Sequence, residues 1–145
     1  MMKNHPTCIF ILALLLSGCA VEPQPINYGA DACNYCKMNI VDTQHAAQFV
    51  TSKGKCYRFD AIECMLNLEK DFVEAPIELF LICDYAKPGS LIDATTATYL
   101  ISENIPSPMG GFLSGFSSSD EAKTIKTEAG GELFTWQQLK TMYRD

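Results

Sequence analysis

The alternation of apolar and polar residues predicts a strand–strand–helix–strand unit in the first half of the chain. Two short β-prone runs, at 45–51 and 55–59, are separated by a polar turn that contains glycine, which is typical of a β-hairpin. From 60 to 72 the apolar residues recur at helical spacing and give the segment one apolar face. The segment 78–83 is almost continuously apolar, as in a strand that is buried on both faces.

The second half of the chain repeats this order with different residues. Strands are predicted at 97–101 and 111–116, on either side of a proline-rich loop. A helix with a thin apolar stripe follows at 118–129, and a short strand is predicted at 133–134. A last helix is predicted to open at Thr135. We therefore expect a single α+β domain made of two related units, with the helices packed against an antiparallel-rich sheet.

Polar residues at fixed spacing predict where the first two helices begin and end. Asp60 with Glu63, and Ser118 with Glu121, each have the spacing of a capping box, in which the first side chain accepts a hydrogen bond from the first helical turn. The glycine pair at 130–131 predicts the end of the second helix.

The start of the chain is typical of a bacterial lipoprotein signal. Lys3 gives a positive start, the run 8–16 is apolar but too short to span a bilayer, and small residues then precede Cys19. A plain secretory peptide has no need of a cysteine at the cleavage site. The ending Leu16-Ser17-Gly18-Cys19 resembles the lipobox, in which the cysteine is acylated and becomes the first residue of the mature chain. We expect 1–18 to be the signal peptide and Cys19 to be lipidated.

The segment after this cysteine predicts how the domain is attached to a membrane. It contains two prolines and no apolar periodicity, so 19–30 is expected to be a flexible tether and 31–145 the folded domain. The thiols of the folded part would then lie in an oxidising compartment. We expect a lipoprotein that faces the periplasm, in the outer membrane since no acidic residue directly follows Cys19 to favour inner-membrane retention.

Charge and motif content argue against several functions. The chain of 145 residues has 11 Lys and Arg against 17 Asp and Glu, a net charge of −6, and its basic residues form no run. Nucleic-acid binding is therefore not expected, because it needs clustered basic residues. No GxSxG or phosphate-loop pattern occurs, and His45 is the one histidine that remains after signal removal. At the start of a strand it is expected to be solvated or hydrogen-bonded rather than a metal ligand.

The most informative local pattern is Cys33-Asn34-Tyr35-Cys36-Lys37-Met38. Two thiols three positions apart can bind one metal ion, and Met38 adds a thioether; soft sulfur donors of this kind favour Cu(I). The pair could instead be a redox dithiol, although the thioredoxin arrangement places such a pair after a buried strand. Half of a zinc site and a structural disulfide are further alternatives.

A second sulfur donor is expected in the loop between the strands of the second half. Met109 is flanked by two prolines and two glycines at 105–111, where a side chain is poorly placed to fill a core. Its alternative role is that of a partly buried packing residue. If the segment with Cys33 and Cys36 folds over this loop, Met109 completes a Cu(I) site. Three further cysteines, which lie on predicted strands and a helix, are expected to belong to the fold: Cys56, Cys64 and Cys83.

Taken in order, these motifs resemble the NosL family of copper-chaperone lipoproteins, which are accessory to nitrous oxide reductase. The features that carry the resemblance are the lipobox cysteine, the CxxCxM segment, the loop Ser107-Pro108-Met109-Gly110 and the glycine pair before the last strand. The resemblance implies two related units like the core of organomercurial lyase. It also implies Cu(I) binding, with matching sulfur positions at Cys33, Cys36, Met38 and Met109.

The resemblance further implies a partner. Copper would be handed to the maturation machinery of nitrous oxide reductase, a periplasmic protein and ABC transporter assembly. In this reading the chain is a metallochaperone and not an enzyme. The alternatives are a thiol-disulfide oxidoreductase that uses Cys33 and Cys36, and a lipoprotein that docks on a partner through its acidic surface with its thiols paired.

Overall fold

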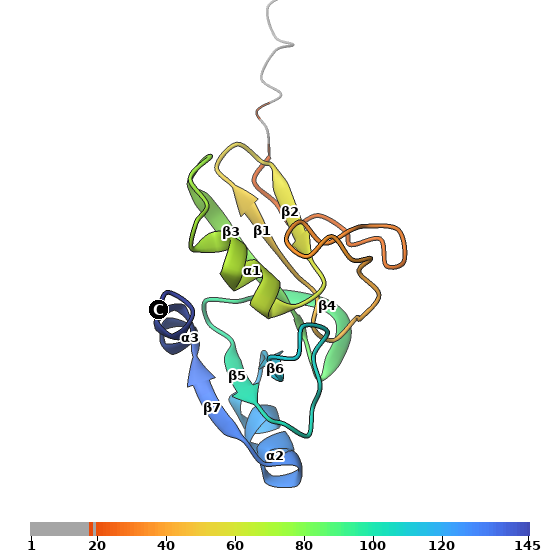
Figure 1. Ribbon diagram of the computed structural model, residues 1–145, viewed down its shortest axis with the longest axis vertical. Coiled ribbons are helices and arrows are strands. Elements are labelled where there is room, and N and C mark those ends of the chain that lie inside the picture. The colour runs from red at the N-terminus through yellow and green to blue at the C-terminus, as the bar shows by residue number, and fades with distance from the viewer. Residues whose placement is uncertain (1–17, 19) are drawn as a thin grey trace, which may run out of the picture.

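Two antiparallel sheets and three helices make up the part of the chain that the computed structural model describes, Gly18 and residues 20–145 (Figure 1). The elements in chain order are β1 (Ala47–Thr51), β2 (Cys56–Phe59), α1 (Ile62–Glu69), β3 (Ile77–Asp84), β4 (Lys87–Asp93), β5 (Thr98–Ile101), β6 (Leu113–Phe116), α2 (Ser119–Ala129), β7 (Glu132–Thr135) and α3 (Trp136–Met142). Except for Gly18, the predicted signal peptide lies outside the described residues, and so does Cys19. None of the helices described has the length and apolar composition needed to cross a membrane.

The two sheets repeat the same topology. The first has the strand order β2-β1-β3-β4 and the second β6-β5-β7, so that β1 and β5 occupy equivalent central positions. Each central strand pairs antiparallel with both of its neighbours. In each half a helix connects the second strand to the third, α1 in the first half and α2 in the second. The α+β fold with two strand–strand–helix–strand units is therefore confirmed.

The strand β4 is not evident from the apolar pattern. It pairs antiparallel with β3 at the edge of the first sheet, and its first residues, Lys87 to Ser90, are exposed. Pro88 and Gly89 interrupt any β-prone run there. Proline is tolerated at a sheet edge because its missing N–H can face away from the ladder.

The helix termini confirm the predicted caps of the two later helices but not the cap of α1. Ser118 accepts a hydrogen bond from the Glu121 N–H, and α2 ends at Gly130 with φ of 75°. At α3 both halves of a capping box are formed by Thr135 and Gln138. The capping box predicted from Asp60 and Glu63 is wrong, because the N-cap of α1 is Ala61 and no side chain caps it. Both carboxylates are free for other contacts.

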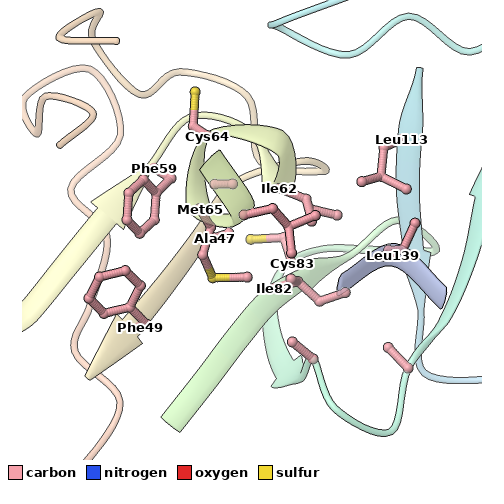
Figure 2. Close-up of a cluster of buried hydrophobic side chains, with 14 of the residues drawn as sticks. Ala47, Phe49, Phe59, Ile62, Cys64, Met65, Ile82, Cys83, Leu113 and Leu139 are labelled. Carbon is pink, nitrogen blue, oxygen red and sulfur yellow. The ribbon is translucent and has the colours of Figure 1, made fainter. Parts of the chain in front are cut away.

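The main core fills the space between α1 and the first sheet and extends to Leu113 of β6 and Leu139 of α3 (Figure 2). The ring of Phe49 on β1 packs against those of Tyr57 and Phe59 at centroid distances of 4.9 and 5.3 Å. Figure 2 shows Met65 of α1 pointing among these apolar side chains, whereas the sulfur of Cys64 points away from them. Two neighbouring residues of α1 therefore point in different directions: Met65 into the core, and Cys64 toward a different site.

The two halves are joined by buried contacts between β6 and the first sheet. His45, just before β1, is buried with its Nδ1 3.0 Å from Asp42 Oδ2 and its Nε2 3.1 Å from Ser114 Oγ on β6. The expectation of a hydrogen-bonded histidine is confirmed. Gly115 of β6 lies so close to Ile82 of β3 that a Cβ atom would collide with the isoleucine side chain.

Residues 24–28, which the sequence placed in the tether, are held on the first sheet. Gln24 and Gln48 exchange two hydrogen bonds, of 2.9 and 2.7 Å, and the Arg58 side chain donates to Pro25 O at 3.0 Å. The Tyr28 hydroxyl lies 3.2 Å from Cys83 Sγ. These polar contacts, together with the packing of Ile26 and Tyr28 against the main core, hold the segment in place.

Candidate metal centre

Three thiols and one carboxylate meet beside the first turn of α1. The ligand atoms of Cys33, Cys36, Asp60 and Cys64 all lie within 4.8 Å of one another. Cys33, Cys64 and Asp60 are 1%, 0% and 3% exposed, while Cys36 is partly exposed. The cluster therefore has a buried inner side and one thiol at the surface.

The CxxCxM segment is a closed loop held by hydrogen bonds within its own backbone. The Cys33 N–H donates to Met38 O at 2.8 Å, and the Lys37 N–H donates to Cys33 O at 3.1 Å. Lys37 takes up a φ of 69°, a left-handed conformation that few side chains adopt, and this lets the chain reverse. The reversal brings the Met38 backbone against that of Cys33.

A reciprocal pair of hydrogen bonds ties this loop to β2. The Asn34 N–H donates to Arg58 O at 2.8 Å, and the Arg58 N–H donates to Asn34 Oδ1 at 2.7 Å. The Arg58 side chain also lies 3.3 Å from Asp31. Because Arg58 is two residues before Asp60, these contacts bring the CxxC thiols to the start of α1.

Asp60, just before α1, and Cys64, in its first turn, face this loop. The Cys36 thiol donates to the Asp60 carboxylate, with Sγ 3.4 Å from each oxygen. Cys64, one turn further along, approaches Cys33. Neither residue was predicted to belong to the site, because Asp60 had the spacing of a helix cap and Cys64 bordered an apolar helix face. A carboxylate and a thiol four positions apart at a helix start were the signal that could have revealed them.

The three thiols of the cluster differ in their proton affinity. A hydrogen bond from the Cys64 thiol, aided by nearby backbone N–H groups and opposed by burial, lowers the pKa of Cys33 from 9.0 to about 6. The same hydrogen bond, together with burial, raises the pKa of Cys64. Burial is the main cause that raises the pKa of Cys36. At neutral pH the metal-free cluster therefore holds one thiolate, on Cys33, and two thiols.

Both predicted thioether donors are exposed at the surface. Met38 is 49% exposed and Met109 is 39% exposed. Met109 lies in the loop between β5 and β6, which reaches the first turn of α1 through a hydrogen bond from Ser107 to the Glu63 carboxylate. The loops that carry the two methionines therefore both attach to residues 60–64.

The remaining thiols and the histidine take no part in this cluster. Cys56 donates to Gln48 Oε1 at 3.5 Å on the first sheet. Cys83 is buried beside Tyr28, and His45 is held by Asp42 and Ser114. All five cysteines in the described part of the chain are free thiols.

Comparisons with known proteins agree on one family. The NosL family model matches residues 25–143. The copper-binding lipoprotein NosL of Stutzerimonas stutzeri is 24% identical over 144 residues, which covers 89% of this chain and 76% of that protein. The crystal structure of the copper chaperone NosL from Shewanella denitrificans superposes with a TM-score of 0.70 at 19% identity, over 81% of this chain and 95% of that one. This structural likeness shows a shared fold.

Proposed function

The chain belongs to the NosL family, and on this basis we propose that it is a Cu(I) chaperone that supplies copper for the maturation of nitrous oxide reductase. The observation that carries the proposal is the convergence of Cys33, Cys36 and Cys64 within 4.8 Å, together with the Asp60 carboxylate. Thiolates are soft donors that select Cu(I). The named relatives, a copper-binding lipoprotein and a copper chaperone, support the same cargo.

The proposed donors are Cys33, Cys36, Met38 and Met109, with Cys64 added by its position in the cluster. Cys33 is the strongest first donor, because its lowered pKa makes it a thiolate at neutral pH, so that copper binding there need not displace a proton. Asp60 orients Cys36 through its hydrogen bond and places a negative charge beside the cation. A low-coordinate Cu(I) ion needs only some of these donors at one time.

The gradient of exposure suggests how copper is handed over. Cys33 and Cys64 are buried, Cys36 is partly exposed, and the two thioethers are more exposed still. Ligands of an acceptor protein can therefore displace the outer donors first, while the inner thiolate keeps the ion from water. Transfer by stepwise ligand exchange requires no chemical bond to the cargo other than these metal–ligand bonds, so the proposed role is that of a carrier and not an enzyme.

Competition for Cu(I) tests the donor set. The purified protein is expected to withdraw about one Cu(I) from a Cu(I)-specific chelator, as a single cluster allows. Replacement of Cys33 and Cys36 by serine and of Met109 by leucine should abolish this uptake. The matched control is Cys56→Ser, which removes a thiol outside the cluster and should leave uptake intact. Unchanged affinity in the triple variant would refute the site.

The proposed partner is the maturation machinery of nitrous oxide reductase, a periplasmic protein and ABC transporter assembly. Loss of this protein should lower the copper content of nitrous oxide reductase, and the wild-type gene but not the triple variant should restore it. Restoration by the triple variant would show that delivery does not use these donors.

Attachment to a membrane through acylated Cys19 is part of the proposal. The related protein from Stutzerimonas stutzeri is named a lipoprotein, and the sequence around Cys19 fits a lipobox. Labelling with a fatty acid should mark the wild type and not Cys19→Ser. Label in the outer-membrane fraction would support the expected location, and label in the inner membrane would correct it.

A thiol-disulfide oxidoreductase is the second candidate, because a lowered pKa such as that of Cys33 is typical of a reactive thiol. The geometry favours the carrier: Cys33 is 1% exposed, and the pair lies in a closed loop rather than at a helix N-terminus. Metal-free protein that rapidly reduces insulin would favour the oxidoreductase.

A further inference from the structure

A buried carboxylate connects the first turn of α1 to the loop that carries Met109. Glu63 is 3% exposed, and its Oε1 accepts a hydrogen bond from the Ser107 hydroxyl. Its Oε2 is buried and has no hydrogen-bond partner in the described part of the chain. Burial of a carboxylate is costly unless it is compensated. The helix N-terminus offsets part of the charge, but Glu63 does not serve as a cap.

Ser107 closes the loop on both sides of Met109. Its hydroxyl oxygen accepts from the Phe112 N–H at 3.0 Å, and its carbonyl oxygen accepts from the Gly110 N–H at 3.0 Å. At the base of the loop the Ser102 N–H donates to Phe112 O at 3.1 Å. Met109 is therefore carried on a short, internally hydrogen-bonded turn whose orientation depends on Ser107.

The turn packs so closely against Glu63 that there is no room for a side chain at Gly111. A Cβ atom on Gly111 would lie 2.6 Å from Glu63 Oε1. Gly110 and Phe112, on either side, both have positive φ, of 72° and 57°. Left-handed backbone at a non-glycine residue is uncommon and is held by its surroundings. The contact between this turn and Glu63 is therefore a specific feature of the fold.

We propose that Glu63 and Ser107 are positioning residues, which hold the Met109 thioether at the copper site. Glu63 is the neighbour of Cys64 in the first turn of α1, so the Glu63–Ser107 hydrogen bond links the Met109 loop directly to the turn that carries a cluster thiol. The strands β5 and β6 anchor the two ends of the loop, and this hydrogen bond ties the turn around Met109 itself to α1. The inference rests on the proposed function, since it requires Met109 to bind copper.

Coupled variants test this inference. Cu(I) competition is measured on the wild type, Ser107→Ala, Met109→Leu and the double variant. Loss of an outer-shell contact typically lowers metal affinity 10- to 100-fold, so we expect Ser107→Ala to weaken Cu(I) binding by about tenfold. In the Met109→Leu background the same substitution should have no further effect, because the thioether it positions is already absent.

A spectroscopic readout and a conservative control separate positioning from general damage. The methyl signal of isotope-labelled Met109 should shift when the wild type is loaded with Cu(I), and this shift should shrink in Ser107→Ala. Glu63→Gln keeps the carbonyl oxygen that accepts from Ser107 and should retain affinity, whereas Glu63→Leu removes the acceptor and should lose it.

Four other results would overturn the inference, and each would point to a different cause. An equal loss from Ser107→Ala with and without Met109 would mean that the serine acts on the fold alone. A loss in Met109→Leu but none in Ser107→Ala would reject the positioning role and leave the copper site standing. No effect of Met109→Leu would remove Met109 from the site, and with it this inference, while Cu(I) uptake by the cysteines would still stand. No Cu(I) uptake by the wild type would reject the proposed function itself.

Discussion

The sulfur atoms of Cys64 and Cys33 lie within 4.8 Å of one another, and this approach joins the first turn of α1 to the CxxC loop. It connects a residue that sequence analysis assigned to the core with one assigned to copper. The Cys64 thiol acts as a hydrogen-bond donor that lowers the pKa of Cys33, and the pKa of Cys64 is raised in turn, so the metal-free pair loses its first proton from Cys33.

Removal of this donor should change the ionisation of Cys33. In the metal-free wild type the pKa of Cys33 is lowered to about 6, so thiolate absorbance in the ultraviolet should appear as the pH rises through this value. In Cys64→Ala the midpoint should move up toward the ordinary value of 9.0, since burial then acts without the hydrogen bond. Cys64→Ser, which can still donate, should lie between the two. An unchanged midpoint in Cys64→Ala would contradict the assigned cause.

The contact between Asn34 and Arg58 should be needed to present the CxxC loop. Asn34→Ala removes the oxygen that accepts from the Arg58 N–H. Such a bond contributes roughly 1 kcal/mol to stability, and its loss should lower Cu(I) affinity by about tenfold because the loop is no longer fixed beside Asp60. Chemical denaturation and chelator competition measure the two effects. Asn67→Ala on α1 is the matched control, and equal losses in both variants would count against a role for the loop.

His45 should support the fold and not the metal. It is buried between Asp42 and Ser114, so His45→Ala leaves two polar groups without their partner and should lower the free energy of unfolding by about 1–3 kcal/mol. The Cu(I) stoichiometry at a temperature where the variant is folded should not change. A variant with normal stability and lost copper would instead identify His45 as a ligand.

The close approach of the two halves can be tested at Gly115. A methyl group there collides with Ile82, so Gly115→Ala should destabilise the protein by about 1–3 kcal/mol. Ile82→Val removes the atom that is struck, and the double variant should recover part of the loss. Additive losses in thermal unfolding would show that the two residues do not touch in solution.

Much of the fold could be predicted from the sequence because its signals are local. The hairpin at β1 and β2 and the capping residue Ser118 are determined by residues near one another in the chain. The strand β4 escaped prediction because Pro88 and Gly89 occupy an exposed edge, where burial imposes no apolar pattern. The two strand–strand–helix–strand units followed from the repeated pattern of elements, whereas their separation into two sheets was not predicted.

The candidate metal centre could be predicted only in part, for a related reason. The spacing of Cys33 and Cys36 in the sequence predicts a metal-binding pair. Cys64 lies beside them only because the loop is tied to β2 through Asn34. Such a long-range contact leaves no periodic signal. Asp60 was not predicted as a site residue because its spacing from Glu63 is also that of a helix cap.

X-ray absorption at the copper edge of the Cu(I)-loaded protein tests the central claim most directly, since it reports the oxidation state and the donor atoms together. The account predicts a Cu(I) edge and a first shell of sulfur atoms that is lost when Cys33 and Cys36 are replaced by serine. A first shell of nitrogen and oxygen, or a sulfur shell that survives this double replacement, would contradict it.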